Sequence, residues 1–403
     1  MTAAIIFLLT YAGVAAGRIP GLALDRVGIA VLGAIAMVVG GVLTPAQALS
    51  SIDLPTVLLL YALMIVSAQL RLGGFYTRTA TAVTRLLRRP RLFLLALMVS
   101  SALLSALLAN DIVCFAFTPV LTLGLLAAGL DPVPFLIGLA VSSNIGSAAT
   151  LIGNPQNMLI GQVGRLDFLA FTRWCLPPAV IALVGSYLLI LWGCRRAMVQ
   201  TPSVSRAPET ALPPFDPWQT GKGLAAVAAL VALFLTPIPR EVSALGVAGV
   251  LLCSRRMKTR DMLGLVDWHL ITLFGALFVV THAISQGSYP ATAVSVINRL
   301  GIELSHPAWL TAVSALLSNI FSNVPAAMLL IRFLDPAEPL QWYVLSVSST
   351  FAGNLFIIGS IANLIVIEQA ARLGIRIGFA RHAAVGVPVT VFSLAVLVGW
   401  AWM

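Results

Sequence analysis

The sequence predicts an all-α polytopic membrane protein of two inverted repeats, with about ten transmembrane spans, two re-entrant hairpins and two broken helices. The chain is 59% hydrophobic and only 9% charged, whereas charged residues make up about a quarter of a soluble domain. Apolar runs of about 17 to 25 residues, long enough to cross a bilayer as helices, recur along the whole chain. None of them alternates as the strands of a membrane barrel do, so helical spans are expected.

The charge and cysteine patterns narrow the class further. A net charge of +10 would point to nucleic acid in a soluble protein, but here the basic residues flank apolar runs, so the bilayer is the expected partner and nucleic acid is not. The four cysteines lie far apart without a CxxC pair, and no cofactor is expected. The first apolar run has no Lys or Arg before it and is interpreted as a span rather than a signal peptide.

The first predicted repeat covers residues 1–196. Its apolar runs are separated by loop signals, and two of them depart from a plain span. Residues 92–109 and 112–130 form a hairpin, 92–130, joined by Asn110-Asp111, and the stretch from Ser142 to Gly161 carries many amides around an interrupting Gly153-Asn154-Pro155. In order, the predicted elements are spans 2–17, 27–44 and 54–70, hairpin 92–130, broken span 135–162 and span 176–194.

A Pro-, Ser- and Thr-rich cytoplasmic linker, 197–219, precedes the second predicted repeat, 220–403. Two local matches support the repeat: residues 105–111 resemble 314–320, and Gly153 to Asn157 has the same spacing as Gly359 to Asn363. In order, the predicted elements are spans 221–236, 241–253 and 268–285, hairpin 307–334, broken span 342–370 and span 383–402.

The length of one hairpin arm decides the predicted topology. Residues 324–334 would span only about 16 Å as a helix, half the hydrocarbon thickness, so hairpin 307–334 must be re-entrant. By symmetry hairpin 92–130 is interpreted as re-entrant too, although each arm is long enough to cross. Each repeat then makes an odd number of net crossings, and the two repeats are inverted.

The basic residues test this topology. If the loop after the third span is cytoplasmic, 19 of the 24 Lys and Arg residues lie inside. The five placed outside are Arg165, Arg173, Arg240, Arg299 and Arg332. The positive-inside rule therefore predicts that both termini lie outside, in a multi-pass protein of the inner (plasma) membrane.

The two interruptions predict a binding site. Asn154 before Pro155 is typical of an N-cap followed by Pro at the first helical position, with Gly153 ending the preceding half. Gly359 and Ser360 offer the same chemistry in the second repeat. Helix N-termini attract an anion, and freed carbonyls can coordinate a cation, so broken helices that meet near the bilayer midplane favour a secondary transporter.

The hairpin tips are expected to close around these breaks, with Asn110 and Asp111 as candidate caps of the first outgoing arm and Asn323 or Val324 as the cap of the second. Asp111 is the one carboxylate placed deep within the membrane and is interpreted as a proton carrier or cation ligand. A sodium ion would use Asn110, Asp111, Gly153, Asn323 and Gly359. The predicted substrate and ion site comprises Asn110, Asp111, Asn144, Thr150, Gly153, Asn154, Asn157, Ser322, Asn323, Asn354, Gly359, Ser360 and Asn363.

Four segments in the expected order resemble the ion transporter superfamily, which holds arsenite permeases, citrate and dicarboxylate transporters, sodium/proton antiporters of the same fold and the melanosomal P protein. They are ANDIVCFAFTP, NIGSAATLIGNPQN, SNIFSNVPAAMLL and AGNLFIIGSIANLIV. The resemblance implies a homodimer with a scaffold part and a moving part, an elevator-type mechanism, and a site between hairpin tips and broken helices. The tips differ from the Ser-Asn-Thr of the sodium-coupled carboxylate branch, so proton coupling through Asp111 stays an alternative to sodium coupling.

The expected function is secondary active transport of a small anion or oxyanion, of carboxylate or arsenite type, driven by a proton or cation gradient. A sodium/proton antiporter without an organic substrate is the alternative. An enzyme is not expected, because the spans contain no paired Asp, Ser–His constellation or HExxH pattern. A channel is disfavoured because inverted repeats with hairpins suit alternating access.

Overall fold

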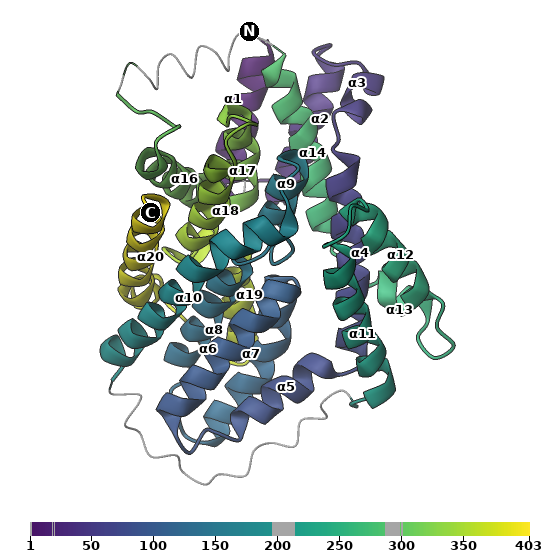
Figure 1. The fold of residues 1–403 in the computed structure, drawn as a ribbon. Coiled ribbons are helices and arrows are strands. Elements are labelled where there is room, and N and C mark those ends of the chain that lie inside the picture. Colours follow the sequence, from purple (N-terminus) through teal and green to yellow (C-terminus); the bar gives the residue numbers. More distant parts are fainter. Residues whose placement is uncertain (1, 18, 20, 196–213, 287–298, 300) are drawn as a thin grey trace.

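The computed structural model describes residues 2–17, 19, 21–195, 214–286, 299 and 301–403, and within these ranges the chain is helical without a strand (Figure 1). The all-α prediction is therefore confirmed. Before residue 196 the helices are α1 (Thr2–Ala16), α2 (Arg26–Val39), α3 (Pro45–Ser50), α4 (Leu54–Leu72), α5 (Phe75–Thr84), α6 (Pro90–Leu107), α7 (Asn110–Ala127), α8 (Val133–Ser147), α9 (Pro155–Val163) and α10 (Phe168–Gly193).

The helices after residue 213 follow a similar order of long, short and interrupted elements. They are α11 (Pro217–Leu233), α12 (Arg240–Leu252), α13 (Thr259–Leu263), α14 (Trp268–Ser285), α16 (Pro307–Phe321), α17 (Asn323–Leu330) with the 3-10 turn η2 (Ile331–Phe333), α18 (Pro339–Ala352), the 3-10 turn η3 (Ile357–Gly359), α19 (Ile361–Arg372) and α20 (Phe379–Ala401). By length and composition, six helices among the described residues can cross a membrane: α4, α6, α7, α10, α14 and α20.

Aspartate N-caps explain two helix starts that differ from the prediction. Asp167 accepts a hydrogen bond from the N–H of Ala170, so α10 begins at Phe168 rather than at 176. Asp216 caps α11 in the same way, so this helix begins inside the predicted linker 197–219. Of that linker, residues 197–213 lie outside the described residues.

Two further boundaries differ from the prediction. The helix predicted over 27–44 ends at Val39, because Gly40 closes it and Gly41 follows with a φ of 71°. The last span begins at Phe379 rather than at 383, and Pro388 lies inside it. The short helices α3, α5 and α13 were not predicted, since they are too brief to show an apolar run.

The helices pack as two groups. The frame group consists of α1, α2, α4, α11, α12 and α14, in which α2 packs against α14 and α4 against α12. The hairpin group consists of α6 to α10 and α16 to α20, in which α6 packs against α8, α16 against α18, and α10 against α20. In Figure 1 the frame helices α4, α11 and α12 lie on the right, and α10, α16 and α20 lie on the left.

Helix α8 lies at the centre of the hairpin group. Every residue from Val133 to Ser147 is buried, which is typical of a helix surrounded by protein on all sides. Its contacts with α6, α7, α10, α18 and α19 account for that burial. The break that follows α8 is therefore buried in protein, which is the condition under which irregular backbone persists at membrane depth.

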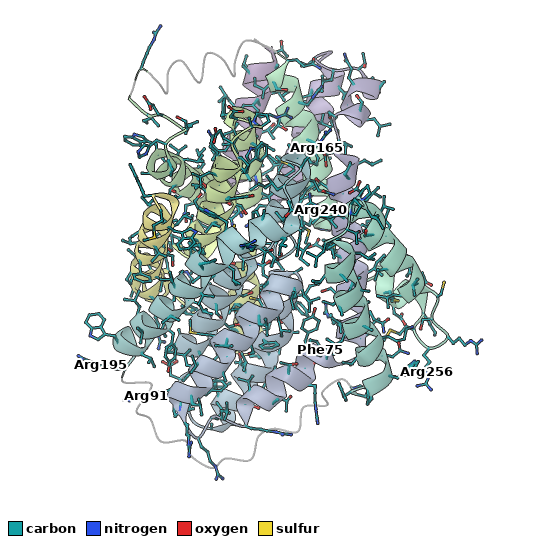
Figure 2. All side chains as sticks on the ribbon, viewed as in Figure 1. Phe75, Arg91, Arg165, Arg195, Arg240 and Arg256 are labelled. Atoms are coloured by element: carbon teal, nitrogen blue, oxygen red, sulfur yellow. The ribbon has the colours of Figure 1, made fainter. Side chains whose placement is uncertain are left out.

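The basic residues separate toward two ends of the molecule. Figure 2 shows Arg91, Arg195 and Arg256, which the charge count assigns to the cytoplasm, in the lower half of the view. Arg165 and Arg240, assigned to the outside, lie in the upper half. In Figure 1 both chain termini also lie in the upper half.

Candidate functional site

The first break runs from the end of α8 to the start of α9. Asn154 Oδ1 accepts a 2.8 Å hydrogen bond from the backbone N–H of Asn157, and Pro155 is the first helical residue of α9. The predicted N-cap is confirmed. The predicted role of Gly153 as the end of the preceding half is wrong, because α8 already stops at Ser147.

The second break has the same organisation. Ser360 caps α19, and its Oγ accepts a hydrogen bond from the N–H of Ala362 at 3.2 Å, as predicted. The preceding helix, α18, ends at Ala352 with Gly353 as its C-cap. Gly359 lies in the turn η3 and does not end α18, so its predicted role as terminator is wrong as well.

Gly153 is required by close backbone approach instead, and Gly359 lies against a side chain and, less closely, the backbone of Gly353. A Cβ at Gly153 would lie 2.7 Å from Ser147 Cα and 2.8 Å from Ser105 O. A Cβ at Gly359 would lie 2.8 Å from Asn319 Oδ1. The backbone contacts leave room only for glycine at position 153, whereas at position 359 the Asn319 amide would have to shift.

Asn157 and Asn363 hold the two breaks in matching ways. Asn157 Nδ2 donates to the carbonyl oxygen of Thr150 at 2.9 Å, and Asn363 Nδ2 donates to that of Phe356 at 3.1 Å. Each amide also donates to a carbonyl at the end of the helix before the break. The two asparagines therefore satisfy carbonyls that the interruption releases from helical hydrogen bonds.

Asn144, on α8, joins the two breaks across the protein. Its Nδ2 donates to Asn354 Oδ1 at 2.9 Å and to Asn363 Oδ1 at 3.2 Å. Its Oδ1 accepts a hydrogen bond from Ser360 Oγ at 3.0 Å. The structure thus brings four predicted site residues, Asn144, Asn354, Ser360 and Asn363, together in one buried cluster. We call this cluster, with the residues of both breaks and both hairpin tips that bond to it, the asparagine cluster.

Thr350, on α18, makes the corresponding connection to the first break. Its Oγ1 accepts from Asn154 Nδ2 at 3.3 Å and from Gln156 Nε2 at 3.2 Å. Ser346, one turn earlier on α18, donates to Asn157 Oδ1 at 2.7 Å. Each central helix therefore contacts the break of the other half of the chain.

The tip of the first hairpin seats on the first break. The N–H of Asn110 donates to Gly153 O at 3.2 Å, and its side-chain Nδ2 donates to Asn144 Oδ1 at 3.2 Å. Ser143 Oγ donates to the carbonyl oxygen of Asn110 at 3.2 Å. The predicted capping of α7 by Asn110 or Asp111 is wrong, because Ala109 is the N-cap residue and makes no side-chain cap bond.

The tip of the second hairpin seats on the second break. With its amide oriented as the neighbouring atoms require, Asn323 donates to Gly359 O and Ser349 O, each at 3.0 Å, and accepts from Gln156 Nε2 at 3.2 Å. Ser322 is the N-cap residue of α17 and has a φ of 76° without a side-chain cap bond. The predicted capping by Asn323 is therefore wrong, and its side chain reaches across to the break.

Two atoms at the centre of this cluster lack a partner. Asn110 is 5% exposed and Asn354 0% exposed. Asn110 Oδ1 and Asn354 Nδ2 have no hydrogen-bond partner among the described residues, although both side chains bond to Asn144. An unsatisfied buried polar atom costs about 1–3 kcal/mol. An acceptor and a donor left open on either side of Asn144 are suited to a small polar ligand.

Asp111 is not part of this cluster. It lines a separate cavity of about 140 Å³ together with Ala109, Asp267 at the start of α14 and Arg71 in the last turn of α4. The guanidinium of Arg71 stacks over the ring of Phe115 on α7, 4.3 Å from its centroid. Sequence reasoning placed Arg71 in a loop, whereas α4 extends to Leu72 and carries it into the contact with the hairpin group.

Several further residues of the cluster were missed from the sequence. His382 is not among the predicted site residues, but it is buried, and its Nε2 lies 3.3 Å from Asn354 O. Thr150, which was predicted, donates from Oγ1 to the carbonyl of Ala106 on α6. The other missed residues are Ser143, Gln156, Asn319, Ser346, Ser349 and Thr350, of which Gln156 and Asn319 lie inside the four segments that carry the family resemblance.

The chain has two broken helices whose breaks are joined by hydrogen bonds, and a hairpin tip covers each break. This arrangement defines the class of membrane transporters that bind their substrate at discontinuous helices. The chain belongs to the citrate transporter family, whose family model matches residues 6–346. It is a secondary transporter of this type, and the resemblance found in the sequence is confirmed.

Curated relatives with similar sequences are themselves transporters or membrane proteins. The silicon efflux transporter LSI3 of Oryza sativa subsp. japonica is 28% identical over 94% of this chain and 92% of its own length. The inner membrane protein YbiR of Escherichia coli (strain K12) is 32% identical over 80% of this chain and 81% of its own. The putative transporter arsB of Dictyostelium discoideum is 22% identical over 98% and 89%.

A solved structure shares the fold. The YdaH transporter of Alcanivorax borkumensis aligns with a TM-score of 0.57 at 14% identity, covering 99% of this chain and 96% of that one. This likeness extends over nearly the whole of both chains and concerns the fold alone.

Proposed function

We propose that this protein moves a small anion or oxyanion, of carboxylate or arsenite type, across the inner membrane in exchange or together with a proton or cation. The observation that carries the proposal is the pair of unpartnered atoms, Asn110 Oδ1 and Asn354 Nδ2, in the cluster that joins both breaks. Helices α9 and α19 begin at the same cluster, and the positive ends of their dipoles favour a negative ligand.

The proposed coupling group is Asp111. Its cavity lies between α7 of the hairpin group and α4 and α14 of the frame group, so a change in its charge acts on the contact between the two groups. A sodium ion at the tips would compete with existing bonds, since the carbonyls of Gly153 and Gly359 both accept from tip asparagines. Proton coupling is therefore the form we favour.

We propose an elevator-type mechanism in which the hairpin group moves against the frame group. The packing supports this division, because α2, α4, α12 and α14 contact one another in the frame and α6, α8, α16 and α18 in the hairpin group. We also propose that the two halves are inverted repeats, because their breaks match. We propose that both termini lie outside, because the labelled arginines separate toward two ends of the molecule in Figure 2. A homodimer is proposed from the family resemblance and is tested by light scattering of the purified protein in detergent.

A sodium/proton antiporter remains the second candidate function. Asp111 and Asp267 line the same cavity, and two carboxylates near one space are suited to a cation that exchanges with protons. Proton-loaded vesicles containing the purified protein distinguish the two. Fluorescence dequenching on addition of sodium, without any response to anions, supports the antiporter.

The direct test of anion transport combines binding and flux. Thermal-shift measurements with arsenite, antimonite, citrate, succinate, sulfate and sodium identify the ligand that raises the melting temperature. Flux of that ligand into proteoliposomes is then measured with and without a proton gradient. Flux that ignores every ion gradient and the membrane potential overturns the coupled mechanism.

A further inference from the structure

A second, larger cavity opens away from the Asp111 cavity. It has a volume of about 890 Å³ and lies between the start of α4, the end of α9, the later half of α14, the end of α17 and the start of α18. The charged and titratable side chains that line it are Asp53, Arg165, His282 and Arg332. None of the residues predicted as the substrate and ion site lines it.

Three helices, α9, α17 and α18, contribute residues both to this cavity and to the asparagine cluster. Helix α9 has Asn157 in the cluster and Val163 at the cavity, and α18 has Ser346 in the cluster and Trp342 at the cavity. At 1.5 Å per residue these steps correspond to about 9 Å and about 6 Å of helix. Met328, on α17 behind Asn323, also lines the cavity. A ligand in the cavity is therefore separated from the cluster by one to two helical turns.

The charge in this cavity is predominantly positive. Arg165 and Arg332 take part in no ion pair among the described residues. Asp53 is the one lining carboxylate, and its Oδ1 already accepts a 2.9 Å hydrogen bond from the N–H of Thr56 as the cap of α4. A cleft lined by one sign of charge concentrates ligands of the opposite sign.

Arg165 occupies a backbone position that normally belongs to glycine. Its φ is 47°, and it follows Gly164 at the end of α9, where the N–H of Leu166 donates to Gly161 O at 3.0 Å. This bond pattern is the Schellman ending, in which a left-handed residue is usually Gly. A side chain there costs about 1 kcal/mol or more. The chain tolerates that cost and thereby places a guanidinium at the cavity.

We propose that this cavity is an anion-capture vestibule, in which Arg165 and Arg332 concentrate a negatively charged substrate on the outer side before it reaches the asparagine cluster. The consequence for transport rests on the proposed function, and it narrows the substrate to a species that carries net negative charge when it enters. The electrostatic property of the vestibule itself does not depend on which substrate is moved.

Charged thiol reagents test the vestibule without any substrate. Cys194 and Cys253, the two cysteines that are not buried, are first replaced by serine. Ser51→Cys then reports from the cavity lining, and Ala46→Cys reports from the exposed face of the adjacent helix α3, outside the cavity. The measured quantity is the ratio of reaction rates with an anionic and a cationic methanethiosulfonate. Because both reagents need the same access, the ratio isolates the local potential.

We expect this ratio to be about tenfold higher in the Ser51→Cys protein than in the Ala46→Cys protein, and to fall toward the control when Arg165→Gly and Arg332→Gln are added. Arg165→Gly suits the left-handed backbone, so misfolding does not explain a loss. Equal ratios at the two positions, or a ratio unchanged by the double variant, overturn the proposal.

Flux supplies an independent arm with citrate as the probe. Arg165→Gly should raise the KM for citrate about fivefold to tenfold with little change in kcat, while Arg173→Gln on α10, outside the cavity, should leave both unchanged. If citrate is not transported at all, citrate is excluded as the substrate, and the thiol ratios still decide on the vestibule. An unchanged KM in Arg165→Gly with active citrate flux contradicts the capture role.

Discussion

The amide of Asn144 donates a 2.9 Å hydrogen bond to Asn354 Oδ1 and thereby connects α8 with the break that follows α18, 210 residues further along the chain. Both side chains are fully enclosed by protein. Since Asn144 also bonds to the tip residue Asn110, one side chain links a hairpin tip to the opposite break. This amide therefore ties the first hairpin tip to the second break.

Replacing Asn144 with alanine should destabilise the protein and remove ligand binding. The change deletes bonds to Asn354, Asn363 and Ser360 at once, and buried partners left unpaired cost about 1–3 kcal/mol each. Thermal unfolding of the detergent-solubilised protein, with and without the ligand found in the screen, measures both effects. Ser100→Ala on α6, whose hydroxyl bonds only within its own helix, is the matched control and should change little. A normal ligand-induced shift in Asn144→Ala contradicts the assignment of the cluster as the site.

Gly153→Ala and Gly359→Ala should each impair folding or transport. At Gly153 the added methyl group meets backbone atoms of Ser147 and Ser105, and overpacking of this kind costs about 1–3 kcal/mol. At Gly359 it meets Asn319 Oδ1, a side-chain end that can shift, so the cost should be smaller than at Gly153. Gly399→Ala on α20, where no atom lies within 4 Å of the new Cβ, should instead be neutral or stabilising. Expression level, melting temperature and flux are compared for the three variants. Wild-type behaviour of both break variants would show that the tight approach is not needed.

Asp111→Asn should abolish coupling to the gradient while the fold stays intact. The amide has nearly the size of the carboxylate but cannot carry a proton between two states, and Asp111 makes no hydrogen bond within the asparagine cluster that folding would lose. Flux in proteoliposomes is measured with and without a proton gradient. Asp261→Asn, on the exposed face of α13, serves as the control and should retain coupling. Gradient-dependent flux in Asp111→Asn refutes the role given to this carboxylate.

Joining α9 to α12 should stop transport if the hairpin group moves against the frame group. Gln162 Nε2 donates to Glu241 Oε2 at 2.9 Å, and Arg240 donates to Gly161 O at 2.7 Å, so these contacts bridge the two groups. Cysteines at 162 and 241, linked by a short bifunctional thiol reagent in the background without Cys194 and Cys253, should block flux until the link is reduced. Proteins that carry only one of the two introduced cysteines should stay active after the same treatment, because the native cysteines that remain, Cys114 and Cys175, are buried. Full flux with complete cross-linking excludes a movement between these two helices.

Local signals in the sequence were sufficient to find where the second half of each broken helix begins. Asn154 before Pro155 predicts an N-cap because side-chain capping depends on neighbours three residues apart. Ser360 is found by the same rule. The terminators were misplaced because Gly153 and Gly359 are glycines for a different reason, the approach of other segments, which no local pattern contains.

The composition of the chain by itself determined that it is an all-helical membrane protein, and the capping residues determined where the second half of each broken helix begins. Only the tertiary structure decided which polar groups meet. It brought Asn144 to Asn354, His382 beside the same asparagine, and Arg71 into the cavity of Asp111. The reason is that a helix break is set by residues close in sequence, whereas the partner of a buried side chain is set by how distant helices pack.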